Sequence, residues 1–315
     1  MKSYFNYILA SLVLISNLCI TSGNAQEDKS VFIGRWDMII MQEGKELPSW
    51  LEISKSGRST LVGRFVYAFG SARPIAEVKV NNGKFSFAIP VQWEPGTNDM
   101  IFEGKMIGEN LEGSMVYSDG KKYDWMARRA PILEYNENIV WGAPIALFNG
   151  ENLKGWSAMG ENQWLVKNGI LESPKPGSNL VSDAKFDNFK LHVEFKYPKG
   201  SNSGIYLRGR HEVQIEDNQG LAPNHLLFGG IYGFLTPNQM AAKNPDEWQV
   251  YDITLNGQRV TIVANGKEII TDQTIPGITG GALDSHEGEP GPILIQGDHG
   301  PIAFRSIVIT PELKE

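Results

Sequence analysis

One predicted strand, HEVQIE, has carboxylate and amide side chains on one face and apolar side chains on the other. In it Glu212, Gln214 and Glu216 alternate with Val213 and Ile215. Because successive side chains of a strand point to opposite faces, the three polar residues share one face. Such a face can grip a hydroxyl-rich ligand and supply a general acid or base. It can equally be a solvated outer face, which is what alternating polar positions usually are.

Four aromatic residues could form a stacking wall for a ligand ring: Tyr206, Tyr232, Phe234 and Trp248. Tyr206 is the strongest candidate, because alternation along the strand that precedes HEVQIE places it on the face of Arg208. Tyr232 is the second candidate. Aromatic side chains of β domains are more often core residues, so the pattern leaves both interpretations open.

The composition is that of an ordinary globular protein with room for two domains. The 315 residues are 41% hydrophobic and 21% charged, and the formal net charge is −7. No basic cluster appears, which disfavours nucleic acid or an anionic membrane as a partner. A neutral carbohydrate is compatible with this balance, and we expect no nucleotide, haem or flavin. The composition leaves the oligomeric state open.

Residues 1–25 have the pattern of a cleavable secretory signal. Lys2 precedes an apolar run from Ile8 to Ile15, and small residues precede the polar stretch after Ala25. The run is shorter than the roughly 20 residues that span a bilayer. We therefore expect cleavage after Ala25 and an exported protein, periplasmic or extracellular, without a membrane attachment. The single cysteine, Cys19, lies in this leader, so the mature chain would have no thiol and, without Lys2, a net charge of −8.

Residues 26–130 predict a small β domain to which the sequence assigns no role. Short alternating runs are separated by turns, and Asn82-Gly83 is a strong hairpin signal because its tight turn needs positive φ. Five or more antiparallel strands in about 100 residues suggest a small barrel or sandwich. Trp36 near the start and Trp125 near the end give a loose resemblance to lipocalin-like barrels.

Residues 131–144 predict a linker, because prolines stand at both ends of a stretch without periodicity. Residues 145–315 predict a second all-β domain, in which only Asn238 to Glu247 could form a short helix. Strands without crossover helices favour two packed antiparallel sheets over parallel βαβ units. We expect the two domains to fold separately.

Short motifs run through this second domain. They are LFNG at 147–150, LKGW at 153–156, NSGI at 202–205, EVQI at 212–215, and GPILIQ at 291–296 followed by His299-Gly300. Together they resemble the bacterial 3-keto-disaccharide hydrolase family, formerly a domain of unknown function with a concanavalin-like jelly-roll fold. The resemblance covers Ile145 to Thr310, and its specificity lies in the combination, since each motif alone is weak.

The resemblance implies an exported enzyme that cleaves glycosides already oxidised to a ketone at C3, as a hydrolase or as a lyase. It carries the family's polar positions onto Arg208, Glu212, Gln214, Asp217, Gln296 and His299. One departure is Asp298, because family members often have a single residue between the glutamine and the histidine. The extra residue puts the direction of His299 in doubt.

A 3-ketone acidifies the hydrogen at C2, so a base can remove it and expel the C1 substituent without an oxocarbenium ion. This requires a base, a stabiliser for the enediolate oxygen and a proton donor to the leaving group. Glu212 and His299 could exchange the protons, and Arg208 could hold the oxyanion. Gln214 and Gln296 suit hydrogen bonds to sugar hydroxyls.

A divalent cation is an alternative electrophile, with Glu212, Asp217 and His299 as its ligands. Asp217 can equally form the turn after the strand together with Asn218. The acidic stretch from Asp284 to Pro290 could bind calcium, but we interpret it as a solvated loop.

Two other functions compete with this one. A retaining glucanase of the laminarinase type has Glu-x-Asp-x-Glu on a similar strand, whereas here Gln214 stands in place of the Asp. Glu212 and Glu216 would start about 13 Å apart along the strand, although a retaining mechanism needs about 5.5 Å. The other competitor is a carbohydrate-binding module, because the same jelly roll serves lectins and a fold does not determine a function.

Overall fold

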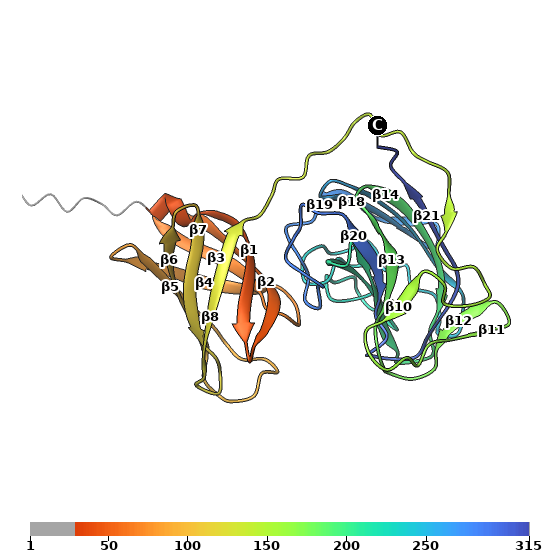
Figure 1. Cartoon of the computed structure of the whole chain (residues 1–315), viewed down its shortest axis with the longest axis horizontal. Helices are drawn as coiled ribbons and strands as arrows, with labels where there is room; N and C mark the ends of the chain where they lie inside the picture. The colour runs from red at the N-terminus through yellow and green to blue at the C-terminus, as the bar shows by residue number, and fades with distance from the viewer. Residues whose placement is uncertain (1–28, 315) are drawn as a thin grey trace, which may run out of the picture.

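The computed structural model describes residues 29–314 as two all-β domains joined by an extended segment (Figure 1). The prediction of an all-β protein is confirmed, since the only helical segment in this range is a short 3-10 turn, η1 (Lys29–Phe32). Between residues 29 and 314, no helix is both long and apolar enough to cross a membrane. The predicted leader, residues 1–25, lies outside the described residues.

The first domain is a closed barrel of eight antiparallel strands, each paired with the next and the last paired with the first. Alternation along each strand turns aromatic and aliphatic side chains into the barrel, where Trp36, Phe65 and Phe102 are fully buried. Asn82 and Gly83 form the expected tight turn, with φ of 51° and 72°. The strands are β1 (Gly34–Gln42), β2 (Lys45–Ser56), β3 (Thr60–Val66), β4 (Arg73–Asn81), β5 (Lys84–Ile89), β6 (Met100–Ile107), β7 (Asn110–Val116) and β8 (Lys122–Arg129).

The second domain is a sandwich of two antiparallel sheets with the main hydrophobic core between them. In order, the first sheet contains β10 (Trp156–Ala158), β13 (Leu180–Phe186), β20 (Gly291–Ile295), β15 (Asn202–Leu207) and β16 (His211–Glu216). The second contains β11 (Leu165–Lys167), β12 (Ile170–Ser173), β21 (Ile302–Pro311), β14 (Phe189–Lys196), β17 (Gln249–Asn256), β18 (Arg259–Ala264) and β19 (Lys267–Thr274), and β9 (Ile145–Ala146) pairs with β21.

The helix considered for Asn238 to Glu247 is wrong, because this segment is an irregular loop. Side chains bind its backbone in place of a helical ladder: Glu247 accepts from the Asn244 amide at 3.0 Å, and Gln249 accepts from the Lys243 amide at 2.9 Å. Polar side chains that compete for local backbone groups disfavour helices.

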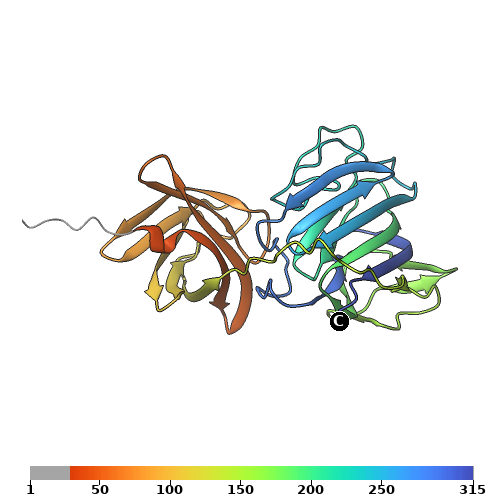
Figure 2. The same ribbon diagram turned by 90° about the horizontal axis from the view of Figure 1, so that it is seen from above.

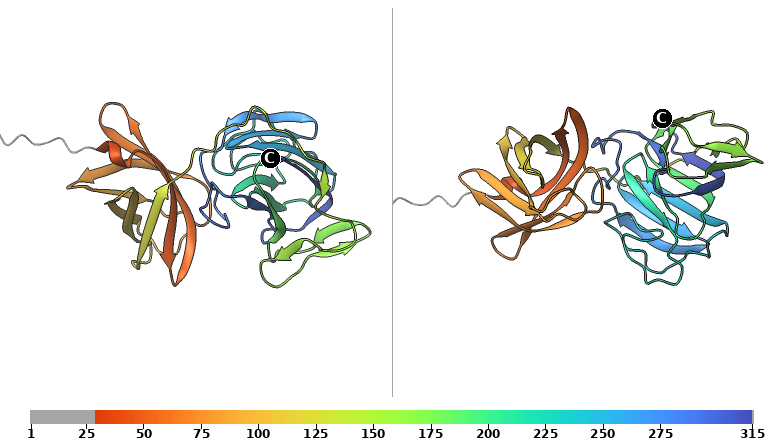
Figure 3. Two further views of the ribbon diagram at one scale, coloured as in Figure 1. Left: turned by 45° about the horizontal axis from the view of Figure 1, so that its top comes forward. Right: turned by 90° about the horizontal axis from the view of Figure 1, so that it is seen from below.

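The two domains share a small buried contact of their own. Trp50 and Val66 of the barrel and Ile278 of the sandwich are fully buried against one another, and Phe234 packs edge-on against Trp50 at 5.4 Å. Ile278 lies in the loop between β19 and β20, which runs between the two lobes in Figure 3. The connecting segment 130–144 instead passes along the outside of the molecule (Figure 2). The β19–β20 loop therefore positions the barrel over the first sheet.

Candidate active site

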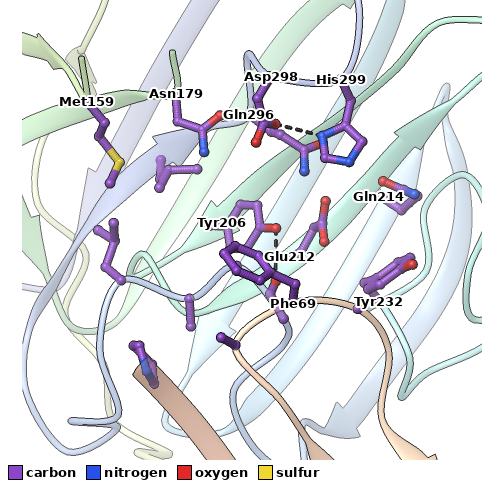
Figure 4. A pocket seen from close by; sticks show the side chains of 18 of the residues that line it. Phe69, Met159, Asn179, Tyr206, Glu212, Gln214, Tyr232, Gln296, Asp298 and His299 are labelled. Carbon is purple, nitrogen blue, oxygen red and sulfur yellow. Dashed lines mark hydrogen bonds and ion pairs between the residues drawn. The ribbon is translucent and has the colours of Figure 1, made fainter. Parts of the chain in front are cut away.

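The main candidate site is a pocket of about 580 Å³ at the junction of the two domains. Strands β15 and β16 of the first sheet line its polar side with Tyr206, Glu212 and Gln214, and Gln296 lies directly after the end of β20. The loop after β20 adds Asp298 and His299, and Figure 4 shows these side chains converging on the centre of the pocket. The structure therefore brings together six of the predicted site residues, since Tyr232 also lines this pocket.

Glu212 occupies the middle of the pocket because the β15–β16 hairpin fixes its register. It pairs with Tyr206, and Gly204 pairs with Gln214 two residues further along. The backbone amide of Glu212 is held by the Thr279 hydroxyl at 3.0 Å, and its carbonyl accepts from the Tyr232 amide at 3.0 Å. The predicted polar face of this strand is thus turned into the pocket at Glu212 and Gln214.

Gly204 makes the room that the Glu212 carboxyl occupies. A Cβ atom at position 204 would lie 2.3 Å from Glu212 Oε1, well inside van der Waals contact. The glycine of the NSGI motif therefore sets the direction of the carboxyl, a role that the sequence motif alone did not suggest.

Burial changes the acidity of Glu212. The side chain is only 3% exposed, and this desolvation raises its pKa to about 8, against the lowering effects of Tyr206 and of His299. The nearby Asp298 carboxylate raises the pKa further. A carboxyl with a pKa close to the working pH can exchange a proton in either direction, as a general acid or base must.

His299 reaches the pocket despite the additional residue before it. Its Nδ1 lies 2.6 Å from Asp298 Oδ1, and this hydrogen bond raises the pKa of the imidazole. The Glu212 carboxylate, which lines the same pocket, also raises this pKa. Asp298 thereby orients His299, which leaves Nε2 for a ligand.

Two glutamine side chains offer acceptors for a polar ligand. Among the described residues, Gln214 Oε1 and Gln296 Oε1 are buried and have no hydrogen-bond partner. The Gln214 amide donates to the Leu226 carbonyl at 3.3 Å, which fixes the orientation of its oxygen. Buried acceptors without partners are costly unless a ligand supplies the donors, and sugar hydroxyls can do so.

Two of the four aromatic candidates, Tyr206 and Tyr232, line the pocket but differ in exposure. Tyr206 is buried, and its hydroxyl donates to the Gly280 carbonyl at 3.0 Å, so it mainly supports the floor beside Glu212. Tyr232 is partly exposed, and the charge of Glu212 adds to the burial that raises its pKa. Its neutral hydroxyl is available as a hydrogen-bond donor at neutral pH.

Arg208 does not reach the pocket, so its predicted role as oxyanion holder has no geometric support. Its φ of 53° places it in the turn after β15, where strand alternation stops. The buried guanidinium donates to the Gly257 carbonyl at 2.5 Å, and burial lowers its pKa to about 10. Arg208 also interacts with the buried carboxyl of Glu287 at the junction of the two domains.

The proposed cation ligands do not form one set. Asp217 accepts a hydrogen bond from the Gly200 amide at 2.9 Å, as in the alternative turn interpretation, and is not part of the pocket lining. Within residues 29–314 no group of three His, Cys, Asp or Glu side chains is arranged to hold a metal ion.

Glu216 also lies outside the pocket lining, unlike Glu212 four residues earlier. Its half-buried carboxyl has a raised pKa because of burial, and Asn218 and Asn202 are its hydrogen-bond partners. The two glutamates thus do not face one substrate together, as the laminarinase arrangement requires.

One wall of the pocket comes from the barrel, which the sequence had not connected with any chemistry. None of its lining residues is charged or carries an amide side chain; they are Leu47, Pro48, Ala68, Phe69, Gly70 and Trp93. Three separate segments of the barrel contribute these residues, so no sequence motif connects them.

Comparisons with known proteins identify the family of the second domain. Residues 143–310, more than half of the chain, match the model of the 3-keto-alpha-glucoside-1,2-lyase-like domain. A 3-keto-disaccharide hydrolase of Bacteroides thetaiotaomicron is 30% identical over 89 residues, which are 24% of this chain and 30% of that protein. The matched segment thus spans less than a third of that relative's length.

Solved structures of similar shape each cover about half of the chain. A Parabacteroides distasonis protein, provisionally described as a glycosyl hydrolase, is 28% identical over 57% of this chain and 93% of its own, with a TM-score of 0.47. A carbohydrate-binding module of Bacillus subtilis is 11% identical over 48% of this chain and 93% of its own, with a TM-score of 0.35.

Proposed function

Because the chain belongs to the family of 3-keto-alpha-glucoside-1,2-lyase-like domains, we propose that it cleaves 3-keto-glycosides, including 3-keto-disaccharides. The observation that carries this proposal is the buried Glu212 carboxyl, with a pKa of about 8, in a pocket with unpartnered amide acceptors. A sugar hydroxyl can donate to each acceptor. A carbonyl beside C2 gives a base of this strength an acidic hydrogen to remove.

The proposed reaction is an elimination that the carbonyl group makes accessible. Ionised Glu212 takes the proton from C2. The electron pair of the broken C2–H bond forms a double bond between C2 and C3, and the C3 carbonyl oxygen becomes an enediolate oxygen. The C3 carbonyl then re-forms, the electrons move into a C1–C2 double bond, and the bond from C1 to the leaving oxygen breaks. That oxygen takes a proton, so the products are an unsaturated 3-keto sugar and an alcohol. Addition of water across the double bond then gives net hydrolysis.

The remaining roles follow from the charges of the side chains. His299, whose pKa the Asp298 hydrogen bond raises, is the proton donor to the leaving oxygen. The Tyr232 hydroxyl and the Gln296 amide group, which both line the pocket, are neutral donors for the sugar oxygens, including the developing enediolate oxygen. In the reactive state Glu212 is ionised and His299 is protonated. Glu212 gains one proton and His299 loses one during the elimination, so the pair keeps the same number of protons and can return to its starting protonation state.

Turnover of a 3-keto-disaccharide in D2O tests this proposal. We expect deuterium at C2 of the released 3-keto sugar, because that position is deprotonated and then reprotonated by solvent. A reaction without enzyme corrects for spontaneous exchange. A saturated 3-keto product that keeps its original hydrogen at C2 would show direct displacement at C1, and tight binding without turnover would favour a carbohydrate-binding module.

We also propose that the protein is exported, from the leader pattern in residues 1–25. The secreted form should begin at Gln26, as determined from its intact mass. A mature protein that retains Met1 to Ala25 would contradict export by signal cleavage.

A further inference from the structure

The barrel wall of the main pocket has no charged or amide side chain, but it carries two large aromatic rings, Phe69 and Trp93. Phe69 is 63% exposed and Trp93 48% exposed, although each lines this pocket. Residues that only join the domains are buried there, as Trp50 is at 0% exposure. Phe69 and Trp93 therefore are not part of the hydrophobic contact between the domains, and their rings are open to a ligand.

The Trp93 ring is held in one orientation by its neighbours. It lies against the backbone of Gly70, where a Cβ atom would be 1.9 Å from the ring, and the Arg73 guanidinium lies 4.9 Å from its centroid. Arg73 is itself fixed by a buried ion pair with Glu94 at 2.7 Å. An aromatic ring fixed before binding loses little conformational entropy when a ligand stacks on it.

The Phe69 loop is joined to the strand that carries the proposed chemistry. The Ala68 carbonyl accepts from the Gly281 amide at 2.8 Å, and the Gly280 carbonyl accepts from the Tyr206 hydroxyl at 3.0 Å. Tyr206 pairs with Glu212 in the β15–β16 hairpin. Hydrogen bonds thus connect the barrel wall to the neighbour of the reacting carboxyl, so the wall has a defined position relative to the ring that reacts.

We propose that Phe69 and Trp93 form a subsite for the leaving-group ring of the substrate. This rests on the proposed function, which places the oxidised ring at Glu212. In a disaccharide the second ring is attached through the C1–O bond that breaks, so it must extend from Glu212 toward the pocket mouth. The C–H face of a pyranose is apolar and suits an aromatic platform, whereas the polar wall suits the hydroxyls of the first ring. The barrel therefore selects substrates with a cyclic leaving group.

Binding to full-length Glu212→Gln protein tests the subsite without turnover. Calorimetry would compare a 3-keto-disaccharide with a methyl 3-keto-glucoside, which has no second ring. We expect Phe69→Ala and Trp93→Ala each to weaken disaccharide binding about fivefold to tenfold and to leave methyl glycoside binding unchanged. Tyr135→Ala is the matched control, because Tyr135 is 51% exposed but does not line this pocket.

The outcomes separate this inference from the proposed function. Equal weakening of both ligands, no weakening of either, or no binding of either ligand would overturn the subsite. Failure of the wild-type protein to cleave the 3-keto-disaccharide would instead overturn the proposed function, while the ratio of the two dissociation constants would still decide the subsite.

Discussion

At the scale of single residues, burial gives Glu212 its chemistry. An ordinary glutamate is ionised and weakly basic at neutral pH, whereas desolvation raises the pKa of Glu212 to about 8. The carboxylate is then a stronger base, at the expense of being largely protonated below that pH. The same burial makes the ionised form sensitive to the neighbouring charges of His299 and Asp298.

The raised pKa of Glu212 predicts that kcat/KM depends steeply on pH. The reactive form has ionised Glu212 and protonated His299, so its population falls as the pH drops below both pKa values, which belong to the coupled pair. We expect kcat/KM to increase roughly tenfold or more from pH 5 to pH 7. The measurement is the initial rate with a 3-keto-disaccharide across this range. A flat profile from pH 5 to 7 would indicate a base with an ordinary carboxyl pKa.

Alternation alone was enough to predict that Glu212 and Gln214 share one face of the strand, but it did not decide between a ligand and solvent on that face. The motif resemblance favoured the ligand and added Gln296 and His299. Arg208 shows where such reasoning fails. Its left-handed backbone conformation ends the alternation, and no residue type at position 208 signals this, since arginine is not a residue that favours positive φ.

At the scale of elements, the β15–β16 hairpin determines the direction of the reacting carboxyl. Its register places the Cα of Gly204 beside the Glu212 side chain, and any larger residue there would meet the carboxyl. Strand register was predictable in part, because Asn-Gly pairs mark several hairpin turns in this chain. The close approach of Gly204 was not, because it depends on which rotamer Glu212 adopts in the folded pocket.

Gly204→Ala should therefore reduce kcat/KM at least tenfold, because a shift of about 1 Å in a catalytic group has effects of this size or larger. Gly288→Ala is the control, since a Cβ atom there would be at an ordinary contact distance of 3.4 Å from its nearest neighbour. The rates should be measured with both variants shown to melt near the wild-type temperature. Unchanged kcat/KM in Gly204→Ala would mean that the position of the carboxyl is not critical.

At the scale of the whole molecule, the stretch from Asp284 to Pro290 joins the domains and is not the solvated loop expected from its composition. Asp284 pairs with Arg210 at 2.6 Å, and Ser285 donates to the Met38 carbonyl of the barrel at 2.7 Å. Glu287 is fully buried. Sequence composition could not reveal this contact, because its partners are more than 70 residues away in the chain.

Glu287 and Asp37 are two buried carboxyls that interact across the domain junction. Burial and the charge of Asp37 raise the pKa of Glu287 well above its usual range, and burial raises the pKa of Asp37 to about 6. Arg208 and Arg35 oppose the shift of Glu287, and Arg128 opposes that of Asp37. The folded protein therefore retains protons that the unfolded chain releases above about pH 4.5.

Stability from this pair is fully present below the unfolded pKa values and is lost as the pH rises through the folded ones. Glu287→Gln removes one titrating carboxyl and should make the melting temperature less sensitive to pH. The melting temperature of Glu287→Gln minus that of the wild type should be at least about 3 °C larger at pH 8 than at pH 5. Glu289→Gln, a nearby change at an exposed position, is the control. If the melting temperatures of the wild type and Glu287→Gln changed equally with pH, Glu287 would not retain a proton in the folded protein.

The central claim is that Glu212 performs the proton transfer, and the direct test is the turnover of a 3-keto-glucoside by Glu212→Gln. The substitution keeps the size of the side chain and removes its basicity, so the rate should fall about a hundredfold or more. Glu216→Gln is a matched control on the same strand outside the pocket lining, and it should retain near wild-type activity. Thermal melting checks the fold, and Glu212→Gln should melt no lower than the wild type, because it removes a buried ionisable group. Near-normal turnover by a well-folded Glu212→Gln protein would contradict the account and would assign the base to His299.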